Sequence, residues 1–365
     1  MFDFSDLPEP PDGEGKPVRV YAVSDVHTDM KENMELILSW PDRPDDVLLL
    51  AGDVSNDLAV LRATFEAVGK RFGHVFYCPG NHDLWVHKSD GCKDSVEKLR
   101  KIEEMCNEMG IRTKPGCVEG IHIVPLHSWY HASFDPDPDV VDENVAPVEK
   151  VMMDFHVCKW PNGLTAHGGS DTVARYMDGL NDDSLVPTGE ERAEGPVISF
   201  SHFLPRRELL PEKRTLFYPP LPKAAGSSFL GRRVERLAPD LHVFGHTHYG
   251  WSQELDGVRY VQACLAYPRE RVERPFSVLN RGAEGEEAMP PLLVYDHGRG
   301  EFPAYRGFWS EYYKVHPREP KDTEWIYRGK RKKAEVLQAL RVVVEAGKQR
   351  VDDASIMAQM SAMGA

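Results

Sequence analysis

Short apolar runs alternate with amphipathic stretches in the first third of the chain. Residues 18–24, 47–51 and 75–78 are nearly continuous apolar runs, which is typical of strands buried on both faces. Residues 29–40 have a helical pattern that ends at Pro41. Two later stretches carry apolar side chains at helical spacing: Leu58, Leu61, Phe65 and Val68, then Val96, Leu99, Ile102, Met105 and Met109. The alternation predicts parallel strands connected by helices.

Strands dominate the second half of the chain. Its apolar runs are residues 121–126, 197–200, 241–244, 258–263 and 291–295. We therefore expect an α/β sandwich with parallel strands early and hairpins late. Two stretches without clear periodicity interrupt it. We interpret residues 130–195 as an insertion, or lid, at the mouth of a site, and residues 205–232 as a second rim.

These patterns divide the chain into three segments. Residues 1–17 are rich in Pro, Gly and acidic side chains, which predicts a flexible tail. Residues 18–300 form the main domain, and residues 301–365 form a C-terminal extension. In this extension, residues 332–348 have the pattern of a helix. We expect an irregular segment before it to pack on the domain through its aromatic residues, Phe308, Trp309, Tyr312, Tyr313, Trp325 and Tyr327.

Composition narrows the classes of function. The 365-residue chain is 41% hydrophobic and carries a net charge of −14, which argues against broad binding to DNA or RNA. Its six cysteines are dispersed without a CxxC pair. The first residues lack the features of a secretory signal, and no apolar run approaches the length of about 18 residues that a membrane span needs. We therefore expect a cytoplasmic protein with reduced cysteines and no membrane span.

Five short blocks of metal-binding side chains stand at or near the ends of predicted strands. They are Asp25-Val26-His27, Gly52-Asp53, Gly80-Asn81-His82-Asp83, Ser201-His202 and Gly245-His246-Thr247-His248. Chemistry in α/β folds is usually located where parallel strands end. Carboxylate, imidazole and amide-oxygen ligands together suit Mn²⁺, Fe and Zn²⁺ better than Mg²⁺ or Ca²⁺. The blocks hold enough ligands for two divalent metal ions that share one carboxylate, and we expect Mn²⁺, with Fe or Zn²⁺ as alternatives.

The order and content of these blocks resemble those of the calcineurin-like metallophosphoesterases. The matching blocks run from residue 25 to residue 248, more than half of the chain. The resemblance implies a four-layer αββα sandwich, in which helices flank two mixed sheets and an inserted lid region covers the site. It also implies a dinuclear metal-dependent hydrolase of phosphoesters, in which a hydroxide that bridges the metal ions attacks phosphorus.

The resemblance also assigns roles to individual residues. One metal ion would be held by Asp25, His27, Asp53 and His248, and the other by Asp53, Asn81, His202 and His246, so that Asp53 bridges the two. His82 would bind neither ion and would protonate the oxygen that leaves, which makes it the expected catalytic residue. Asp83 is expected to support the loop.

Two departures from related subfamilies restrict the class. The phosphoprotein phosphatases carry Asp-Arg-Gly after the second block, whereas this chain continues from Asp53 with Val-Ser-Asn-Asp. Purple acid phosphatases have an iron-binding Tyr at the position of Asn56. Many cyclic-nucleotide diesterases have Asp there, paired with the catalytic His. We therefore expect Asn56 to orient His82, although an amide stabilises a charged imidazole less strongly than a carboxylate does.

The substrate is less constrained than the reaction. Arg206, Trp129 and His131 lie in or beside the expected rim and are candidates for substrate contacts, although each also suits an ordinary structural role. The expected partner is a small-molecule phosphoester or nucleotide. Two alternatives stay open: a phosphodiesterase or nucleotide pyrophosphatase that uses the same site, and a non-catalytic scaffold that retains its metals. The sequence leaves the oligomeric state undefined.

Overall fold

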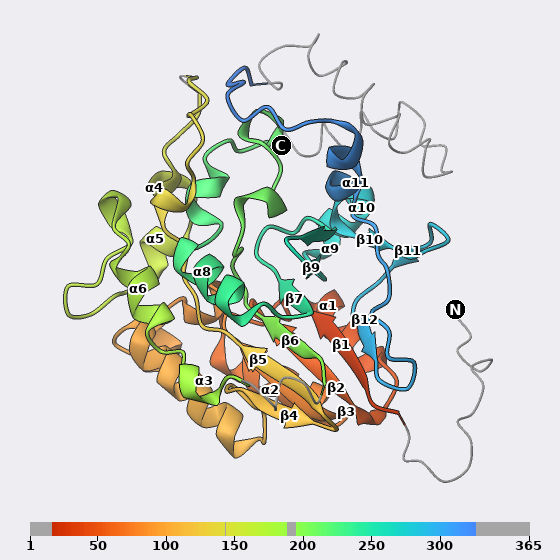
Figure 1. Cartoon of the computed structure of the whole chain (residues 1–365). Helices are drawn as coiled ribbons and strands as arrows, with labels where there is room; N and C mark the ends of the chain where they lie inside the picture. The colour runs from red at the N-terminus through yellow and green to blue at the C-terminus, as the bar shows by residue number, and fades with distance from the viewer. Residues whose placement is uncertain (1–16, 143, 188–194, 326–365) are drawn as a thin grey trace.

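The computed structural model describes residues 17–142, 144–187 and 195–325. Two mixed β-sheets lie face to face in these residues (Figure 1). In the first sheet the order is β12-β1-β2-β3, and β12 is antiparallel to β1 while the others are parallel. Its strands are β1 (Arg19–Val23), β2 (Arg43–Ala51), β3 (Phe72–Cys78) and β12 (Leu292–Asp296).

The second sheet has the order β4-β5-β6-β7-β9-β8. Its four inner strands are parallel, and β4 and β8 form antiparallel edges. Its strands are β4 (Gly116–Val118), β5 (Ile121–Pro125), β6 (Val197–Phe200), β7 (Leu241–Phe244), β8 (Trp251–Leu255) and β9 (Val258–Gln262). A separate short hairpin pairs β10 (Asn280–Arg281) with β11 (Glu287–Ala288).

An apolar layer fills the space between the two sheets. Val20, Leu49 and Phe76 of the first sheet belong to one buried cluster with Phe200 and Val243 of the second. The strands are therefore buried on both faces, which explains why they are continuous apolar runs in the sequence.

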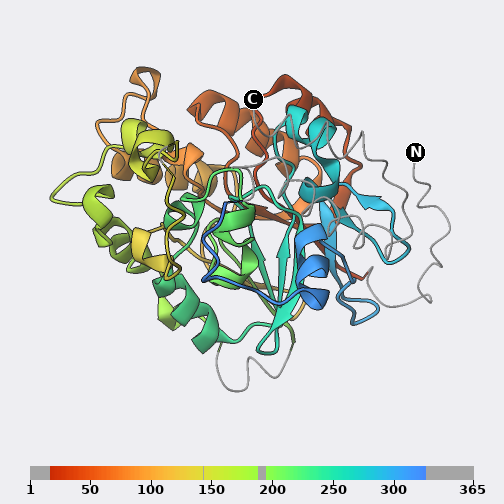
Figure 2. The same ribbon diagram turned by 90° about the horizontal axis from the view of Figure 1, so that it is seen from above.

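Helices cover the outer faces of both sheets. The helices α1 (Lys31–Ser39), α2 (Leu58–Gly69) and α3 (Ser95–Glu108) pack on the first sheet, and their side chains join its buried cluster. The helices α8 (Ser228–Leu237) and α11 (Phe308–Val315) pack on the second sheet. Figure 2 shows α1 to α3, in red and orange, in the upper part of the view, and α8 and α11, in green and blue, in the lower part. The expected layers of helix, sheet, sheet and helix are confirmed.

Several segments differ from the prediction. Residues 130–195 contain α4 (Val148–Val151), α5 (Asp154–Val157) and α6 (Thr172–Asp178), and their buried side chains join the core. The late strands β6, β7 and β9 are parallel, and hairpins occur beside them at β8–β9 and β10–β11. The aromatic residues from Phe308 onward begin a helix instead of an irregular segment. The expected tail before Pro17, Tyr327 and the expected helix at 332–348 lie outside the described residues.

The carboxyl ends of the central strands of both sheets meet at one edge of the molecule. An isolated parallel bridge pairs Ser24 with Cys264, and the Ser24 N–H donates to the Ala263 carbonyl at 2.9 Å. Two further short helices, α9 (Pro268–Glu273) and α10 (Pro275–Val278), follow this junction. Among the described residues, every helix is too short or too polar to cross a lipid bilayer.

Candidate metal centre

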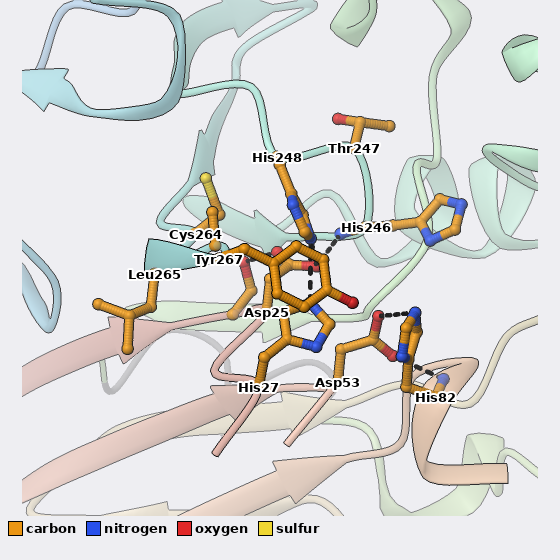
Figure 3. Close-up of polar contacts among 12 residues, drawn as sticks. Asp25, His27, Asp53, His82, His246, Thr247, His248, Cys264, Leu265 and Tyr267 are labelled. Carbon is orange, nitrogen blue, oxygen red and sulfur yellow. Dashed lines mark hydrogen bonds and ion pairs between the residues drawn. The ribbon is translucent and has the colours of Figure 1, made fainter. Parts of the chain in front are cut away.

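All seven predicted metal ligands lie together at this edge. Asp25 and His27 follow β1, Asp53 follows β2, and Asn81 follows β3. His202 follows β6, and His246 and His248 follow β7. Figure 3 shows side chains from the two sheets pointing toward one another across the junction. We call Asp25, His27 and His248 the His27 cluster, and Asn81, His202 and His246 the Asn81 cluster; Asp53 lies between them.

Five of these seven residues have left-handed backbone conformations. Their φ angles are positive: Asp25 (53°), His27 (43°), Asp53 (53°), His246 (75°) and His248 (54°). This conformation is uncommon outside glycine and costs about 1–3 kcal/mol per residue. Backbone hydrogen bonds hold it, as from the Asp25 N–H to the Gly52 carbonyl at 3.0 Å. These conformations therefore lower the stability of the fold, and they direct the candidate ligand side chains inward.

The glycines of the blocks allow a close approach of the loops. A Cβ atom added at Gly80 would lie 2.1 Å from Oδ1 of Asp53. One added at Gly52, where φ is +79°, would lie 2.6 Å from Nδ1 of His202. Because real Cβ atoms do not come so close to other atoms, only glycine fits at both positions.

The hydrogen-bond acceptors of the Asn81 cluster face one another. His202 Nδ1 lies 2.9 Å from the Ala51 carbonyl and His246 Nε2 lies 2.7 Å from the Ala224 carbonyl, so each of these nitrogens carries the ring proton. When the rings are neutral, the other nitrogens, His202 Nε2 and His246 Nδ1, present lone pairs, each 3.0 Å from Oδ1 of Asn81. Acceptors at this separation require a cation or a proton between them, and the cluster therefore fits a metal ion.

The His27 cluster has the same character. His248 Nδ1 lies 2.5 Å from Oε2 of Glu270 and donates its proton there, which leaves a lone pair on Nε2. That Nε2 lies 3.1 Å from Nε2 of His27 and 3.4 Å from Oδ1 of Asp25. Ligand atoms of these three residues, like those of Asp53, His202 and His246, all lie within 4.8 Å of one another. Two ion sites that share Asp53 are compatible with this geometry.

The titratable groups of the site shift one another's pKa values. Burial opposes the charged form of His202, but the Asp53 carboxylate outweighs it and raises its pKa to about 9. For His27 and His246 burial prevails and lowers the pKa to about 3. Burial raises the pKa of Asp53 to about 6. Because ligands must be deprotonated, metal binding here releases protons.

Asp154 supports the Asn81 cluster from within residues 130–195. Its Oδ1 accepts hydrogen bonds from Asn81 Nδ2 at 2.9 Å and from Trp85 Nε1 at 2.6 Å, and its Oδ2 accepts one from the Tyr130 hydroxyl at 3.0 Å. Since Asp154 binds the amide nitrogen of Asn81, the amide oxygen must face the ions. Our sequence analysis missed this residue, because an acid in a stretch without periodicity carries no local signal.

Glu270 supports the His27 cluster from α9. Besides contacting His248, its carboxylate forms an ion pair with Arg274 and accepts the Tyr267 N–H at 3.1 Å. The sequence analysis missed Glu270 as well, since it lies after the last block. Asp83 supports the loops, as predicted, through bonds from the backbone N–H groups of Asp53, Val54, Ser55 and Gly80 and from the Tyr77 hydroxyl.

His82 lies at the open side of the centre, where its side chain is 17% exposed. Its ring stacks on Trp85 with centroids 3.8 Å apart, and its Nε2 lies 3.8 Å from Oδ2 of Asp53. Burial, followed by the nearby imidazoles, lowers the pKa of His82 well below its usual value. Among the described residues no hydrogen bond joins Asn56 to His82, although the Asn56 carbonyl accepts one from the buried Lys98 at 2.7 Å.

The three candidates for substrate contacts have other surroundings. Arg206 forms ion pairs with Glu208 and with Asp256 in the β8–β9 turn, at the sheet edge opposite the metal ligands. Trp129 is 1% exposed and packs in the core, against Trp160 and Phe203 among others. His131 Nε2 accepts the Ser228 N–H at the start of α8. As corrections, the structure does not bring Arg206 to the centre, and Trp129 and His131 are used for packing and helix capping.

Comparison with known proteins agrees with this geometry. The family model of the calcineurin-like phosphoesterases matches residues 18–250, which include every block. The chain belongs to the calcineurin-like phosphoesterase family. It is therefore a phosphoric ester hydrolase, and the scaffold alternative has no support from the family.

Two comparisons concern one relative from Mycobacterium tuberculosis. The chain is 27% identical over 293 residues to its acyl-carrier-protein phosphodiesterase PptH, covering 75% of this chain and 86% of that protein. The crystal structure of phosphopantetheinyl hydrolase PptH aligns with a TM-score of 0.58 and 24% identity, over 75% of this chain and 96% of that one. The structural comparison supports the fold.

Proposed function

We propose that this phosphoesterase hydrolyses a phosphodiester and uses two divalent metal ions held by the His27 and Asn81 clusters. The observation that carries the proposal is the position of Asp53. Its ligand atoms lie within 4.8 Å of those of His27 on one side and of His202 and His246 on the other. Two bound ions would supply Lewis acidity to the phosphoryl oxygens and would activate a water molecule. Of the metals that these ligands accept, we propose Mn²⁺, with Fe or Zn²⁺ as alternatives.

The residues of this chain would position the ester and assist its departure. His82, on the open side and stacked on Trp85, faces the space where a leaving oxygen would lie, and its ring N–H is the group that would hydrogen-bond to it. Asn81 and Asp53 would keep the two clusters at a constant separation, because Asp154 and the backbone of the His82 loop hold their side chains.

Two observations favour a diester over a monoester. The relative PptH is named a phosphodiesterase of an acyl carrier protein. A cavity of about 350 Å³ also adjoins Thr247 and Glu270, next to His248, and could hold a second ester group. Its lining includes the apolar or aromatic Leu216, Phe217 and Tyr249. It also includes two ion pairs, Arg269–Glu273 and Arg274–Glu270. We propose that the substrate is a phosphopantetheine-type diester carried by a protein.

The test is reconstitution of the purified chain after chelation. We expect two equivalents of Mn²⁺ by elemental analysis, and faster hydrolysis of bis-p-nitrophenyl phosphate than of p-nitrophenyl phosphate. Release of phosphopantetheine from a carrier protein would identify the substrate class. Two bound ions with no turnover of any phosphoester would contradict the proposed reaction, and faster monoester hydrolysis would contradict the diester preference.

The predicted cytoplasmic location is part of the same proposal. All six cysteines are free, which supports a reducing compartment. Fractionation of cells that express the full chain, with a thiol-labelling assay on the native protein, would test the location.

A further inference from the structure

A strained segment connects the second sheet to the metal centre and directs one aromatic side chain into it. After β9, the Leu265 N–H donates to the Ser24 carbonyl at 2.8 Å, and the Ala266 N–H donates to the Asp25 carbonyl at 3.0 Å. Ala266 has a φ of 57°, an unfavourable conformation for a residue with a Cβ. Strain of this kind persists only where the surroundings enforce it.

Two side chains hold Ala266 in this conformation. Its carbonyl accepts hydrogen bonds from Asn33 Nδ2 at 2.9 Å and from Arg271 Nη1 at 2.8 Å. Arg271 also donates to Oδ1 of Asn33, at 2.8 Å, so the three residues form one network. The consequence of this arrangement is the direction of the next residue, Tyr267.

Tyr267 covers the His27 cluster with its ring. The ring stacks on the imidazole of His27, with centroids 4.2 Å apart and planes 15° from parallel. The Tyr267 N–H donates to Glu270, which itself binds His248. Figure 3 shows the phenol hydroxyl beyond the ring, pointing toward the space beside Asp53 and His82. Tyr267 is therefore held by its backbone N–H and by its ring, and its hydroxyl points into the space beside Asp53 and His82.

The hydroxyl of Tyr267 differs from those of three other tyrosines, which bond to protein groups. Tyr77 donates to Asp83, Tyr130 donates to Asp154, and Tyr305 donates to the Leu293 carbonyl. Within the described part of the chain, the Tyr267 hydroxyl has no hydrogen-bond partner. A donor that is held in place and left unpaired at the mouth of an active site is available to a ligand.

We propose that Tyr267 is a substrate-binding residue whose hydroxyl donates a hydrogen bond to a non-bridging oxygen of the phosphoryl group. The proposal rests on the proposed function of the metal centre. A phenol O–H adds a donor without adding a positive charge that would repel the metal ions. Because negative charge on the phosphoryl oxygens is redistributed during hydrolysis, a donor held in place contributes to both phosphate binding and turnover.

The test compares the Mn²⁺-loaded full chain with its Tyr267→Phe variant, which removes one oxygen atom and keeps the ring on His27. We expect the Kd of inorganic phosphate, measured by calorimetry, to rise by about tenfold or more, since hydrogen bonds to charged groups have effects of this size. We expect kcat/KM for bis-p-nitrophenyl phosphate to fall by about 10- to 100-fold. Metal content and Tm should stay at the wild-type values.

The Tyr305→Phe variant is the matched control, because it removes a hydroxyl that bonds to a backbone carbonyl on β12. It should leave phosphate affinity and kcat/KM unchanged. Wild-type phosphate affinity and turnover in Tyr267→Phe would overturn the role of Tyr267 while leaving the proposed function intact. A metal-loaded wild-type chain that neither binds phosphate nor hydrolyses any phosphoester would overturn both.

Discussion

The two clusters of the metal centre are built from similar ligands but are supported in different ways. The His27 cluster is supported by Glu270, which is 22 residues from His248 and also pairs with Arg274. The Asn81 cluster is supported by Asp154, which is 73 residues from Asn81. Asp154 accepts hydrogen bonds from an amide, an indole and a phenol, all of them neutral donors.

The difference follows from what each ligand requires. An imidazole needs the correct tautomer, and Glu270 sets it for His248 by accepting the Nδ1 proton. An amide can present either nitrogen or oxygen, and only the oxygen binds a cation. Asp154 excludes the wrong orientation of Asn81 because it accepts hydrogen bonds and cannot donate them when ionised. A carboxylate thus sets the tautomer of His248 at one cluster and the orientation of the Asn81 amide at the other.

The largest effect is expected for the residue that the clusters share. Asp53→Ala should remove both ions and abolish turnover, because Asp53 lies between the clusters. Elemental analysis and the rate with bis-p-nitrophenyl phosphate would check it. Asp57→Ala is the control, since Asp57 caps α2 and should cost only about 1 kcal/mol of stability with both ions kept. One ion retained in Asp53→Ala would show that the clusters are independent.

His82→Ala should slow turnover by about 10²–10⁴-fold, the usual range for a group that assists proton transfer. Both ions should remain bound, because neither cluster includes His82. The measurement is kcat together with metal content. His82 also lies within coordinating distance of His27 and Asp53, so loss of an ion in this variant would instead identify His82 as a ligand.

Asp154→Ala should weaken metal binding at the Asn81 cluster by about 10- to 100-fold, the range for second-layer residues. The ion at the His27 cluster should keep its affinity. A calorimetric titration of the apo-protein with Mn²⁺ would measure the affinity of each cluster separately. Equal weakening of both ions would mean that the two supports are not separate.

Glu270→Gln should weaken the His27 cluster by about tenfold, at the lower end of the same range. The amide can still accept the His248 Nδ1 proton, so only the negative charge is lost. The same titration applies, and the affinity at the Asn81 cluster serves as the internal reference. A larger loss than in Asp154→Ala would reverse our ranking of the two supports.

Asn56→Asp should have the smallest effect. A carboxylate near His82 would favour its charged form and raise its pKa. Because His82 is expected to donate a proton, the alkaline limb of the pH–rate profile should move to higher pH. The profile of kcat/KM between pH 4 and 9, at a saturating Mn²⁺ concentration, would measure the shift. An unchanged profile would remove Asn56 from the proton-transfer scheme.

Sequence reasoning found what depends on local pattern. The buried strands could be predicted because they are apolar on both faces. The candidate ligands could be predicted because they stand at or near the ends of those strands. Arg206 shows the limit of this reasoning. It lies four residues after His202, yet its side chain pairs with Asp256 at the opposite edge of the sheet. Distance along the chain does not determine where a rim side chain points.

By itself, the sequence determined the family and the reaction class, and it predicted seven metal ligands, because each of these is encoded in short blocks. Only the tertiary structure decided which carboxylates support the clusters, that side chains of α4, α5 and α6 join the core, and that Tyr267 covers His27. The physical reason is the range of the interactions. A strand end and its ligand are set by neighbouring residues, whereas Asp154, Glu270 and Tyr267 meet their partners only after the two sheets have packed.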